Sequence, residues 1–406
     1  MPLLPLDDAR AYVLDACTPL APVVLGLDDA LGRVAAEAVT ATEAVPSFDN
    51  SAMDGFAVRA ADTEGAPVIL EVVGALAAGD APTLTVGRGQ AVRIMTGAAL
   101  PAGADAVVMV ERTAAADDGR AVEIQVAVAP GTAWRHAGSD ISPGTVVVSA
   151  GTVLGPGHLG VLASLGVVET SVFPAVRVGV LSTGDELVSG PAPLRPGQIR
   201  DSNRPTLAAL VRQSGAEAVD LGTVADDEAA ITRAFHDAAA RCDAVVTSGG
   251  VSMGDFDLVK VVLDQLGDMR WMQVAIKPAK PFAFGVVSGT PVFGLPGNPV
   301  SSMVSFELLA RPALRKMMGF PAPAWVRRCV PAVAGEALDR RPDGKVHFLR
   351  VVAAMGEDGR YRVTSAGGQG SHHLSAMAGA NALAVLDDGE GVASGAAVAV
   401  MLLDWP

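Results

Sequence analysis

The chain has 406 residues, too many for one ordinary hydrophobic core, so two to four domains are expected. Its formal net charge of −14 argues against a duplex-DNA or anionic-membrane partner, because both need a basic face. Cys17, Cys242 and Cys329 are far apart, without metal spacing, and are expected to be buried thiols in a reducing cytosol. There is no signal-peptide pattern and no apolar run of bilayer length, so we expect a soluble, cytoplasmic protein.

The first 172 residues combine a helical start with β-rich sequence. Asp7 can cap a first helix that carries Val13 and Leu14 on its apolar side and ends near Pro19. Short β-type runs separated by Gly, Asp and Pro turns then cover residues 67–73, 90–95, 106–110 and 121–128. This pattern predicts a β domain over residues 46–141, inserted into a first domain made of residues 1–45 and 142–172 that includes a helix over 158–165.

Residues 173–322 alternate strand, loop and helix in the order of a parallel α/β sheet. Strand-like runs cover 176–181, 244–246 and 291–295, and helices are predicted over 205–213, 227–241, 257–266 and 301–318. Asp227 is a ready N-cap, and Pro312 predicts a kink. Residues 323–406 alternate apolar and polar side chains over short segments, which predicts a small β-barrel or sandwich. The fold class is therefore α/β plus β, in several domains.

Polar loops that contain glycine follow three of the predicted strands. They are Ser182–Glu186, Thr247–Asp257 and Leu295–Pro299. The carboxyl ends of parallel strands share one edge of a sheet, so these loops must converge there. Glycine lets the backbone approach a phosphate, and neighbouring carboxylates favour a hard metal ion. A single such loop is more often a helix-capping turn, but together the three predict a phosphorylated ligand held with Mg²⁺.

Charged residues near these loops add to the same hypothesis. Asp226 and Asp227 end the strand-like run 218–224, and only one of them is needed to cap the next helix. Lys277 and Lys280 are spaced by a proline that holds the backbone extended. Surface lysines are ordinarily solvated, but these follow a further strand-like run. We therefore expect them on the same sheet, where they would balance phosphate or oxyanion charge.

Two further motifs lie outside the α/β segment. Residues 48–58 place Asp49 and Asp54 around a glycine turn, which by itself indicates a structural turn. Residues 367–374 hold His372 and His373 in a glycine-rich loop, but no third ligand follows at metal spacing, so zinc is not predicted. The sequence has no Gly-x-Ser-x-Gly elbow, P-loop or zincin motif, which weakens hydrolase and NTPase interpretations.

Taken together, these motifs resemble the molybdopterin molybdenumtransferase family, of the MoeA type that includes the E domain of gephyrin. Phe48–Val58 is similar to the family's D-N-S-A-M-D-G-Y-A-V, with Phe56 in place of Tyr. Further blocks of the chain that resemble the family in order are Arg93–Ala98, Gly103–Val108 and Gly138–Ile141. The α/β domain that the family shares with MogA-like molybdopterin adenylyltransferases is matched by Ser182–Leu187, Thr247–Asp257, Lys277–Pro281 and Leu295–Ser301.

The resemblance implies an elongated, four-domain subunit that forms a homodimer, with a cleft between the α/β domain of one chain and β domains of the other. It also implies that adenylylated molybdopterin and molybdate bind, that Mg²⁺ assists, and that molybdenum enters the dithiolene while AMP leaves. The implied catalytic residues are Asp54, Thr96, Asp140, Glu186, Asp226 and Asp257, and the last three of these would hold Mg²⁺. The implied substrate-binding residues are Thr183, Gly184, Ser248, Gly249, Gly250, Ser252, Lys277, Lys280, Pro296, Gly297, Asn298 and Ser371.

Three positions depart from the family's pattern. Ala279 replaces the usual Gly between the lysines, which is tolerated unless its φ is positive. Gln273 stands where a basic residue is common, and Asp387 takes a place often held by proline.

Two other functions remain open. The Asp54 segment and the final β domain argue against an adenylyltransferase. The retained carboxylates argue against a molybdopterin-binding scaffold without turnover. A molybdopterin adenylyltransferase and molybdoenzyme maturation proteins are compatible partners, whereas nucleic acid and membranes are not.

Overall fold

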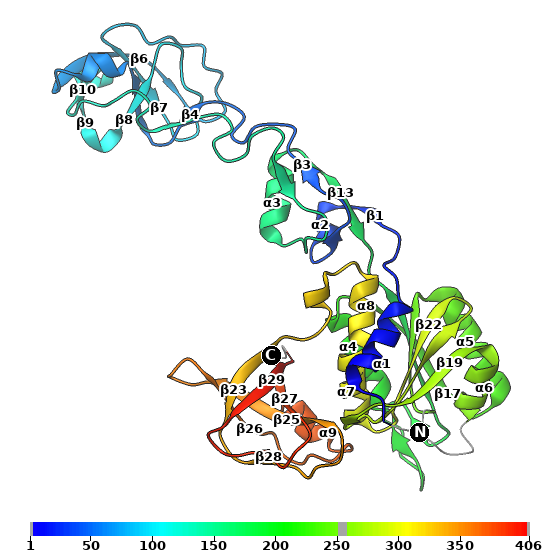
Figure 1. Cartoon of the computed structure of the whole chain (residues 1–406). Coiled ribbons are helices and arrows are strands. Elements are labelled where there is room, and N and C mark those ends of the chain that lie inside the picture. The colour runs from blue at the N-terminus through cyan, green and yellow to red at the C-terminus, as the bar shows by residue number, and fades with distance from the viewer. Residues whose placement is uncertain (1–2, 251–257, 404–406) are drawn as a thin grey trace.

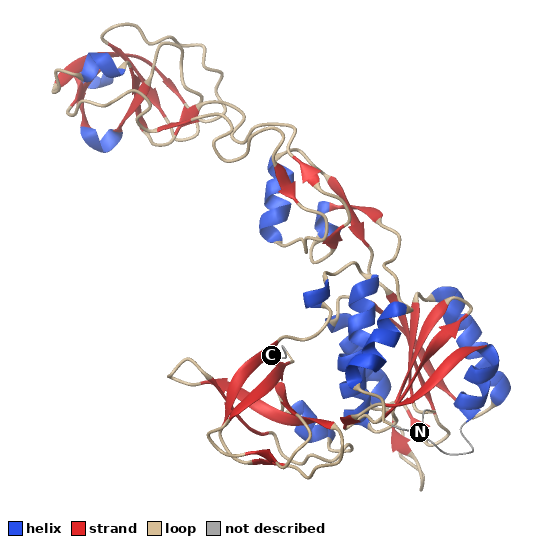
Figure 2. Cartoon of the chain, in the orientation of Figure 1, coloured by secondary structure: helices blue, strands red, loops and turns tan. Residues whose placement is uncertain are grey.

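The computed structural model describes residues 3–250 and 258–403. Figure 1 shows an elongated chain, with an inserted β body at one end and the α/β and C-terminal bodies at the other. Figure 2 shows that the longer helices gather in the α/β body, while the rest of the chain is mostly strands and loops. Within the described ranges, no helix is both long and apolar enough to cross a bilayer.

The inserted β body contains the four predicted β runs as strands. Its six-stranded sheet has the order β8-β5-β7-β6-β10-β9, and a two-stranded pair, β11-β4, lies where the body joins the rest of the chain. The strands are β4 (Asn50–Ser51), β5 (Gly55–Val58), β6 (Val68–Leu76), β7 (Gln90–Ile94), β8 (Ala106–Met109), β9 (Thr113–Ala116), β10 (Ala121–Ile124) and β11 (Trp134–Arg135).

A small body of short elements connects the inserted β body to the α/β body (Figure 1). It has a three-stranded sheet, β1-β13-β2, and a two-stranded sheet, β12-β3. The helix predicted over residues 158–165 is present as α3. The elements are β1 (Val23–Gly26), α2 (Leu27–Ala30), β2 (Val34–Ala35), β3 (Val39–Thr40), β12 (Val146–Val148), α3 (Pro156–Ser164) and β13 (Glu169–Phe173).

The α/β body is built on a six-stranded sheet with the order β17-β14-β18-β22-β21-β19. The first four strands are parallel, as predicted, but β21 runs antiparallel to both neighbours, so the sheet is mixed. The reason is the tight turn at Ser288 and Gly289, both with positive φ, which sends β22 back along β21. The strands are β14 (Arg177–Thr183), β17 (Glu217–Val224), β18 (Ala244–Ser248), β19 (Gly267–Gln273), β21 (Pro281–Val287) and β22 (Thr290–Leu295).

Helices cover both faces of this sheet because successive strand residues point to opposite sides. Val180 and Val246 pack with α4 on one face, whereas Leu181 and Val245 pack with α5 and α6 on the other. Asp227 caps α5 as predicted, accepting a hydrogen bond from the Ala230 N–H at 2.8 Å. The helices are α4 (Asn203–Gln213), α5 (Glu228–Arg241), α6 (Leu258–Leu266), α7 (Pro299–Ser305) and α8 (Arg311–Met317).

The first helix, α1 (Leu6–Asp15), belongs to the α/β body and not to the first domain assigned to residues 1–45. Leu4 pairs with Val274, and Val13 packs in the same core as the β-sheet. Asp7 does not cap the helix, since it lies inside the first turn and pairs with Arg10 at 3.0 Å. The docking of α1 depends on strand pairing between residues far apart in the chain. No local pattern in the first 20 residues predicts this docking.

The helix predicted over residues 301–318 becomes irregular before Pro312, the residue at which the sequence predicts a kink. Residues Phe306–Ala310 form a π-helical turn between α7 and α8. Proline has no N–H, so the carbonyl of Leu308 lacks its usual helical donor. Arg10 of α1 supplies that donor, with Nε 3.1 Å from the Leu308 carbonyl oxygen. The irregular turn therefore also anchors α1.

The C-terminal body is a closed five-stranded barrel with the order β25-β26-β23-β29-β27, closed by the pairing of β25 with β27. A short strand from the α/β body, β20, pairs in parallel with the first residues of β25. Cys329 begins β23 and is exposed, against expectation, whereas Cys17 and Cys242 are buried. The elements are β20 (Ile276–Lys277), β23 (Cys329–Ala334), β24 (Leu338–Asp339), β25 (Val346–Met355), β26 (Tyr361–Ser365), α9 (Leu374–Ala378), β27 (Ala382–Leu386), β28 (Gly391–Val392) and β29 (Ala397–Leu402).

Candidate functional site

The carboxyl ends of β14, β18 and β22 meet at one edge of the α/β sheet. Ser182 pairs with Ser248, which in turn pairs with Leu295, so the three loops begin side by side. They enclose a cavity of about 100 Å³ together with the segment that leads into α4. The cavity is lined by Ser182, Thr183, Glu186, Leu187, Ile199, Arg200, Asp201, Ser202, Asn203, Ser248, Gly249, Gly297 and Pro299.

Asn203 ties two of these loops together. Its side-chain amide donates to Ser248 Oγ and to the Gly297 carbonyl, both at 2.7 Å. No sequence motif assigned a role to Asn203, which lies before the helix start predicted at Pro205. The run Asp201-Ser202-Asn203 indicates that the helix starts before Pro205, since all three residue types favour helix starts.

Asp201 anchors the same wall from inside. Its buried carboxylate accepts hydrogen bonds from Ser182 Oγ and Thr223 Oγ1, each at 3.2 Å. It also accepts from the Arg204 backbone N–H at 3.1 Å and from Arg204 Nε at 3.0 Å. These donors hold the start of α4 against β14 and β17, so Asp201 positions the wall.

The segments that follow β14 and β17 carry three carboxylates, those of Asp185, Glu186 and Asp226. The Asp226 N–H donates to Asp185 Oδ1 at 3.1 Å, and Glu186 follows Asp185 in the chain. Burial, and then the negative charges of Asp185 and Glu186, raise the pKa of Asp226. A cation would relieve this repulsion, and carboxylate oxygens are the donors that Mg²⁺ prefers, so the side chains fit that ion. Glu186 and Asp226 were predicted as site residues from the sequence, whereas Asp185 was not.

The expected Mg²⁺ site is only partly within the described structure. Asp257, the third expected ligand, and Ser252, an expected substrate residue, lie outside the described residues. In the ranges 3–250 and 258–403, no three His, Cys, Asp or Glu side chains are already grouped to hold a metal. Asp226 and Glu186 therefore supply an incomplete set, which would need further oxygen ligands from the substrate or solvent.

Gly249 and Thr183 form adjacent parts of the cavity wall, and the glycine is required there. Its φ is +97°, and a Cβ atom would lie 3.0 Å from the Thr183 carbonyl oxygen. Any side chain would therefore be strained in the backbone and crowded against β14. Expected residues Gly184 and Gly250 lie in the same two loops.

The loop after β22 also contacts the C-terminal barrel. Asn298 is the N-cap residue of α7, and Ser248 Oγ lies 3.5 Å from the carbonyl oxygen of Pro296. The N–H of Val300, the second residue of α7, donates to the Ser371 carbonyl oxygen at 3.1 Å. Ser371 therefore reaches the edge of the α/β site from a different body of the same chain.

Arg350 shapes the loop that carries Ser371. Its guanidinium is buried and donates to the carbonyls of Gly368 and Gly370, at 3.1 and 3.2 Å. Burial lowers the pKa of Arg350 to about 10. The rings of His372 and His373 lie 4.1 Å apart and pack over the glycines of the loop. The histidine pair therefore has a packing role.

Of the two lysines, Lys280 lies next to the α/β sheet as predicted, whereas Lys277 does not. Lys277 lies on β20, which pairs with β25 of the barrel, so it is not on the α/β sheet. Lys280 directly precedes β21, and the start of this antiparallel strand lies at the carboxyl edge beside the end of β22. The segment is not extended either, because the Lys277–Pro278 peptide is cis and Ala279 has a φ of 82°.

Alanine at position 279 was expected to be tolerated in place of glycine only if its φ is not positive, and here its φ is positive. A left-handed conformation costs an alanine about 1–2 kcal/mol, and this side chain is also buried. Ala279→Gly removes the strain but also a buried methyl group, so we expect its free energy of unfolding to stay within about 1 kcal/mol of the parent. Ala279→Val is expected to lower it by roughly 1–3 kcal/mol. Urea unfolding checks both, with Ala275→Val as the control, and an equal effect of the two valines would contradict the backbone argument.

Asp54 and Thr96 form a pair at one end of the inserted β body. Thr96 donates to Asp54 Oδ1 from its backbone N–H at 2.6 Å and from its hydroxyl at 2.7 Å. These two hydrogen bonds lower the pKa of Asp54, so its exposed carboxylate stays ionised. Asp140 lies apart from strands, in the segment that leaves this body, where its N–H donates to Val45.

Comparison with known proteins covers nearly the whole chain. Residues 4–166 match the MoeA N-terminal region (domain I and II), residues 179–316 a probable molybdopterin binding domain, and residues 332–403 the MoeA C-terminal region (domain IV). The molybdopterin molybdenumtransferase of Haemophilus influenzae is 40% identical over 400 residues, 98% of each chain. The chain belongs to the molybdopterin molybdenumtransferase family. Molybdopterin molybdenumtransferase 2 of Mycobacterium tuberculosis is 41% identical over 383 residues, 92% of each chain.

A solved structure of the family shares the whole architecture. The molybdopterin biosynthesis MoeA protein from Pyrococcus horikosii is 31% identical, and the two chains cover each other completely with a TM-score of 0.82. The predicted α/β plus β fold with a C-terminal barrel is therefore confirmed.

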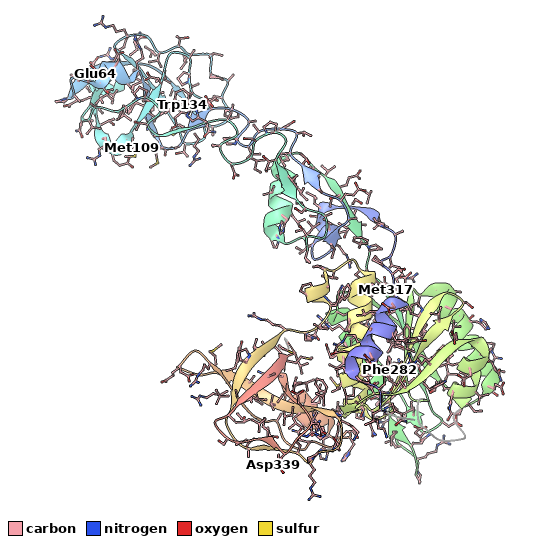
Figure 3. The ribbon with its side chains drawn as sticks, in the orientation of Figure 1. Glu64, Met109, Trp134, Phe282, Met317 and Asp339 are labelled. Atoms are coloured by element: carbon pink, nitrogen blue, oxygen red, sulfur yellow. The ribbon has the colours of Figure 1, made fainter. Side chains whose placement is uncertain are left out.

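Four of the expected catalytic residues form two pairs at opposite ends of this family member, Asp54 with Thr96 and Glu186 with Asp226. Met109, the strand partner of Gly55 beside Asp54, lies in the inserted β body, far from Phe282 in the α/β body (Figure 3). The connecting body separates the two along the chain. Asp54 and Thr96 therefore do not meet Glu186 and Asp226 within one chain.

Proposed function

We propose that this chain inserts molybdenum from molybdate into adenylylated molybdopterin, with release of AMP. The observation that carries the proposal is the cavity at the sheet edge, with its glycine loops and adjoining carboxylates, in a chain related over its full length to molybdopterin molybdenumtransferases. Cleavage of an adenylate depends mostly on positioning and charge neutralisation, which such a site can supply.

Each group of side chains then has a role. Asn203 and the loops it joins orient the substrate, and Glu186 and Asp226, with Asp257, would hold Mg²⁺. When bound, Mg²⁺ would neutralise charge on the phosphate groups. Lys280 and Ser371 would hold molybdate by charge and hydrogen bonds, with Lys277 contributing from the barrel side. The final ligands of molybdenum would be the soft sulfur atoms of the pterin itself.

We also propose that the functional unit is a homodimer with a shared cleft. Asp54 and Thr96 cannot meet Glu186 within one chain. The simplest way to bring them into one cleft is for a second copy of the chain to contribute Asp54 and Thr96 to the cleft that holds Glu186. Exposed apolar side chains near the Asp54 turn support burial against a partner surface. They are Phe48, Met53, Met95 and Val110, with 48%, 45%, 40% and 44% of their surface exposed. We place the reaction in the cytoplasm, since all three cysteines are free thiols.

The assay for this function measures AMP release and cofactor formation by purified protein with adenylylated molybdopterin, molybdate and Mg²⁺. A chelator is expected to abolish AMP release while leaving the melting temperature nearly unchanged, because Glu186 and Asp226 form an incomplete site until substrate phosphates complete it. Adding back Mg²⁺ should restore turnover. Turnover in the presence of chelator, or a large fall in melting temperature, would contradict this role of the ion.

A further inference from the structure

Arg200 lies at the end of β16 (Ile199–Arg200), which pairs in parallel with β15 (Leu187–Val188). The chain between them, residues 189–198, loops out and returns to start in the same direction. Figure 1 shows this green segment projecting beyond the α/β body, at the end where the cavity loops lie. The pairing of Val188 with Arg200 thus returns the arginine to the cavity wall, which it lines.

None of the charged side chains that the structure describes in the cavity wall neutralises Arg200, so it is free to bind an anionic ligand. The charged side chains that line it are Glu186, Asp201 and Arg200. Asp201 is already neutralised by Arg204 at 3.0 Å, and Arg204 also pairs with Asp220. Arg200 donates from Nη2 to the Ala192 carbonyl within its own loop. Across residues 3–250 and 258–403 it forms no ion pair, so its charge and most of its five N–H donors are uncommitted.

We propose that Arg200 binds the phosphate groups of the nucleotide-bearing substrate, an inference that rests on the proposed function. An arginine presents a planar fork of donors that matches phosphate oxygens. Ser202 and Asn203, at the start of the 11-residue helix α4, line the same cavity, so the positive end of that helix adds to the anion-binding character. Arg200 would then neutralise phosphate charge alongside an ion that Glu186 helps to hold.

The test compares Arg200→Ala and Arg200→Lys with Arg195→Ala, a control that removes an exposed arginine from the same loop outside the cavity wall. Arg200→Ala is expected to raise KM for adenylylated molybdopterin and to lower kcat/KM by about ten- to hundred-fold, the usual value of a charged hydrogen bond. KM for molybdate should not change. Arg200→Lys should lose less, and Arg195→Ala should match the parent protein.

Titration with AMP gives a readout that does not depend on turnover. Binding of AMP to the parent protein should weaken with salt, and Arg200→Ala should both weaken binding and reduce the salt dependence. If the parent protein turns over but Arg200→Ala has unchanged KM and unchanged AMP affinity, this inference is overturned and the proposed function stands. If the parent protein neither releases AMP nor binds it, the proposed function itself fails.

Discussion

Glu186→Gln is expected to slow AMP release by about 10²–10³-fold while leaving the fold intact, the size of effect seen when one electrostatic stabiliser is removed from a preorganised site. Glu186 lines the cavity and follows Asp185 in the chain, and burial, then the charge of Asp185, and last that of Glu186 raise the pKa of Asp226. The amide is nearly isosteric but carries no charge for Mg²⁺. Single-turnover measurement of AMP release separates this effect from product release.

A matched control is Glu217→Gln, which neutralises an exposed carboxylate of the same body that pairs with Arg177 at 3.8 Å. It should leave AMP release unchanged, because an exposed pair contributes little and lies away from the cavity. Melting temperatures of both variants check folding. Raised Mg²⁺ should restore part of the activity of Glu186→Gln. A variant with the rate and Mg²⁺ dependence of the parent protein would remove Glu186 from the site.

A mixed dimer of Asp54→Ala and Glu186→Ala chains is expected to recover about half of the parent activity, although each variant alone is inactive. The two groups lie at opposite ends of one chain, so the proposed shared cleft would take Asp54 from one chain and Glu186 from the other. In the mixed dimer one cleft has both native residues and the other has neither. Purification through two different affinity tags isolates the mixed dimer for the AMP assay.

The reciprocal mixture tells sharing from simple cooperation between subunits. A dimer of one native chain and one chain with both substitutions should be nearly inactive, since each of its clefts lacks one residue. Sites confined to single chains would reverse the pattern, leaving this dimer half active and the first mixed dimer inactive. Size-exclusion chromatography should show one dimeric species for every preparation, and a monomer with full activity would exclude a shared cleft.

Local pattern by itself determined the element order and much of the site. The strand-like runs of the inserted body, the helix cap at Asp227 and the irregularity before Pro312 all follow from residue preferences acting over a few positions. The convergence of the Thr183, Ser248 and Gly297 loops also followed, because adjacent parallel strands must end at one edge. The family resemblance rested on the same motifs, and the relatives confirm it.

Only the tertiary structure decided which distant segments meet. Lys277 pairs with the barrel, α1 docks on the α/β body, and Ser371 reaches the start of α7. Local sequence periodicity predicts none of these contacts. Asn203 joined the cavity wall because a side chain from a helix start happened to span two loops. Such contacts depend on packing and strand pairing between residues far apart in the chain, where many alternatives have similar local propensity and the global arrangement selects one.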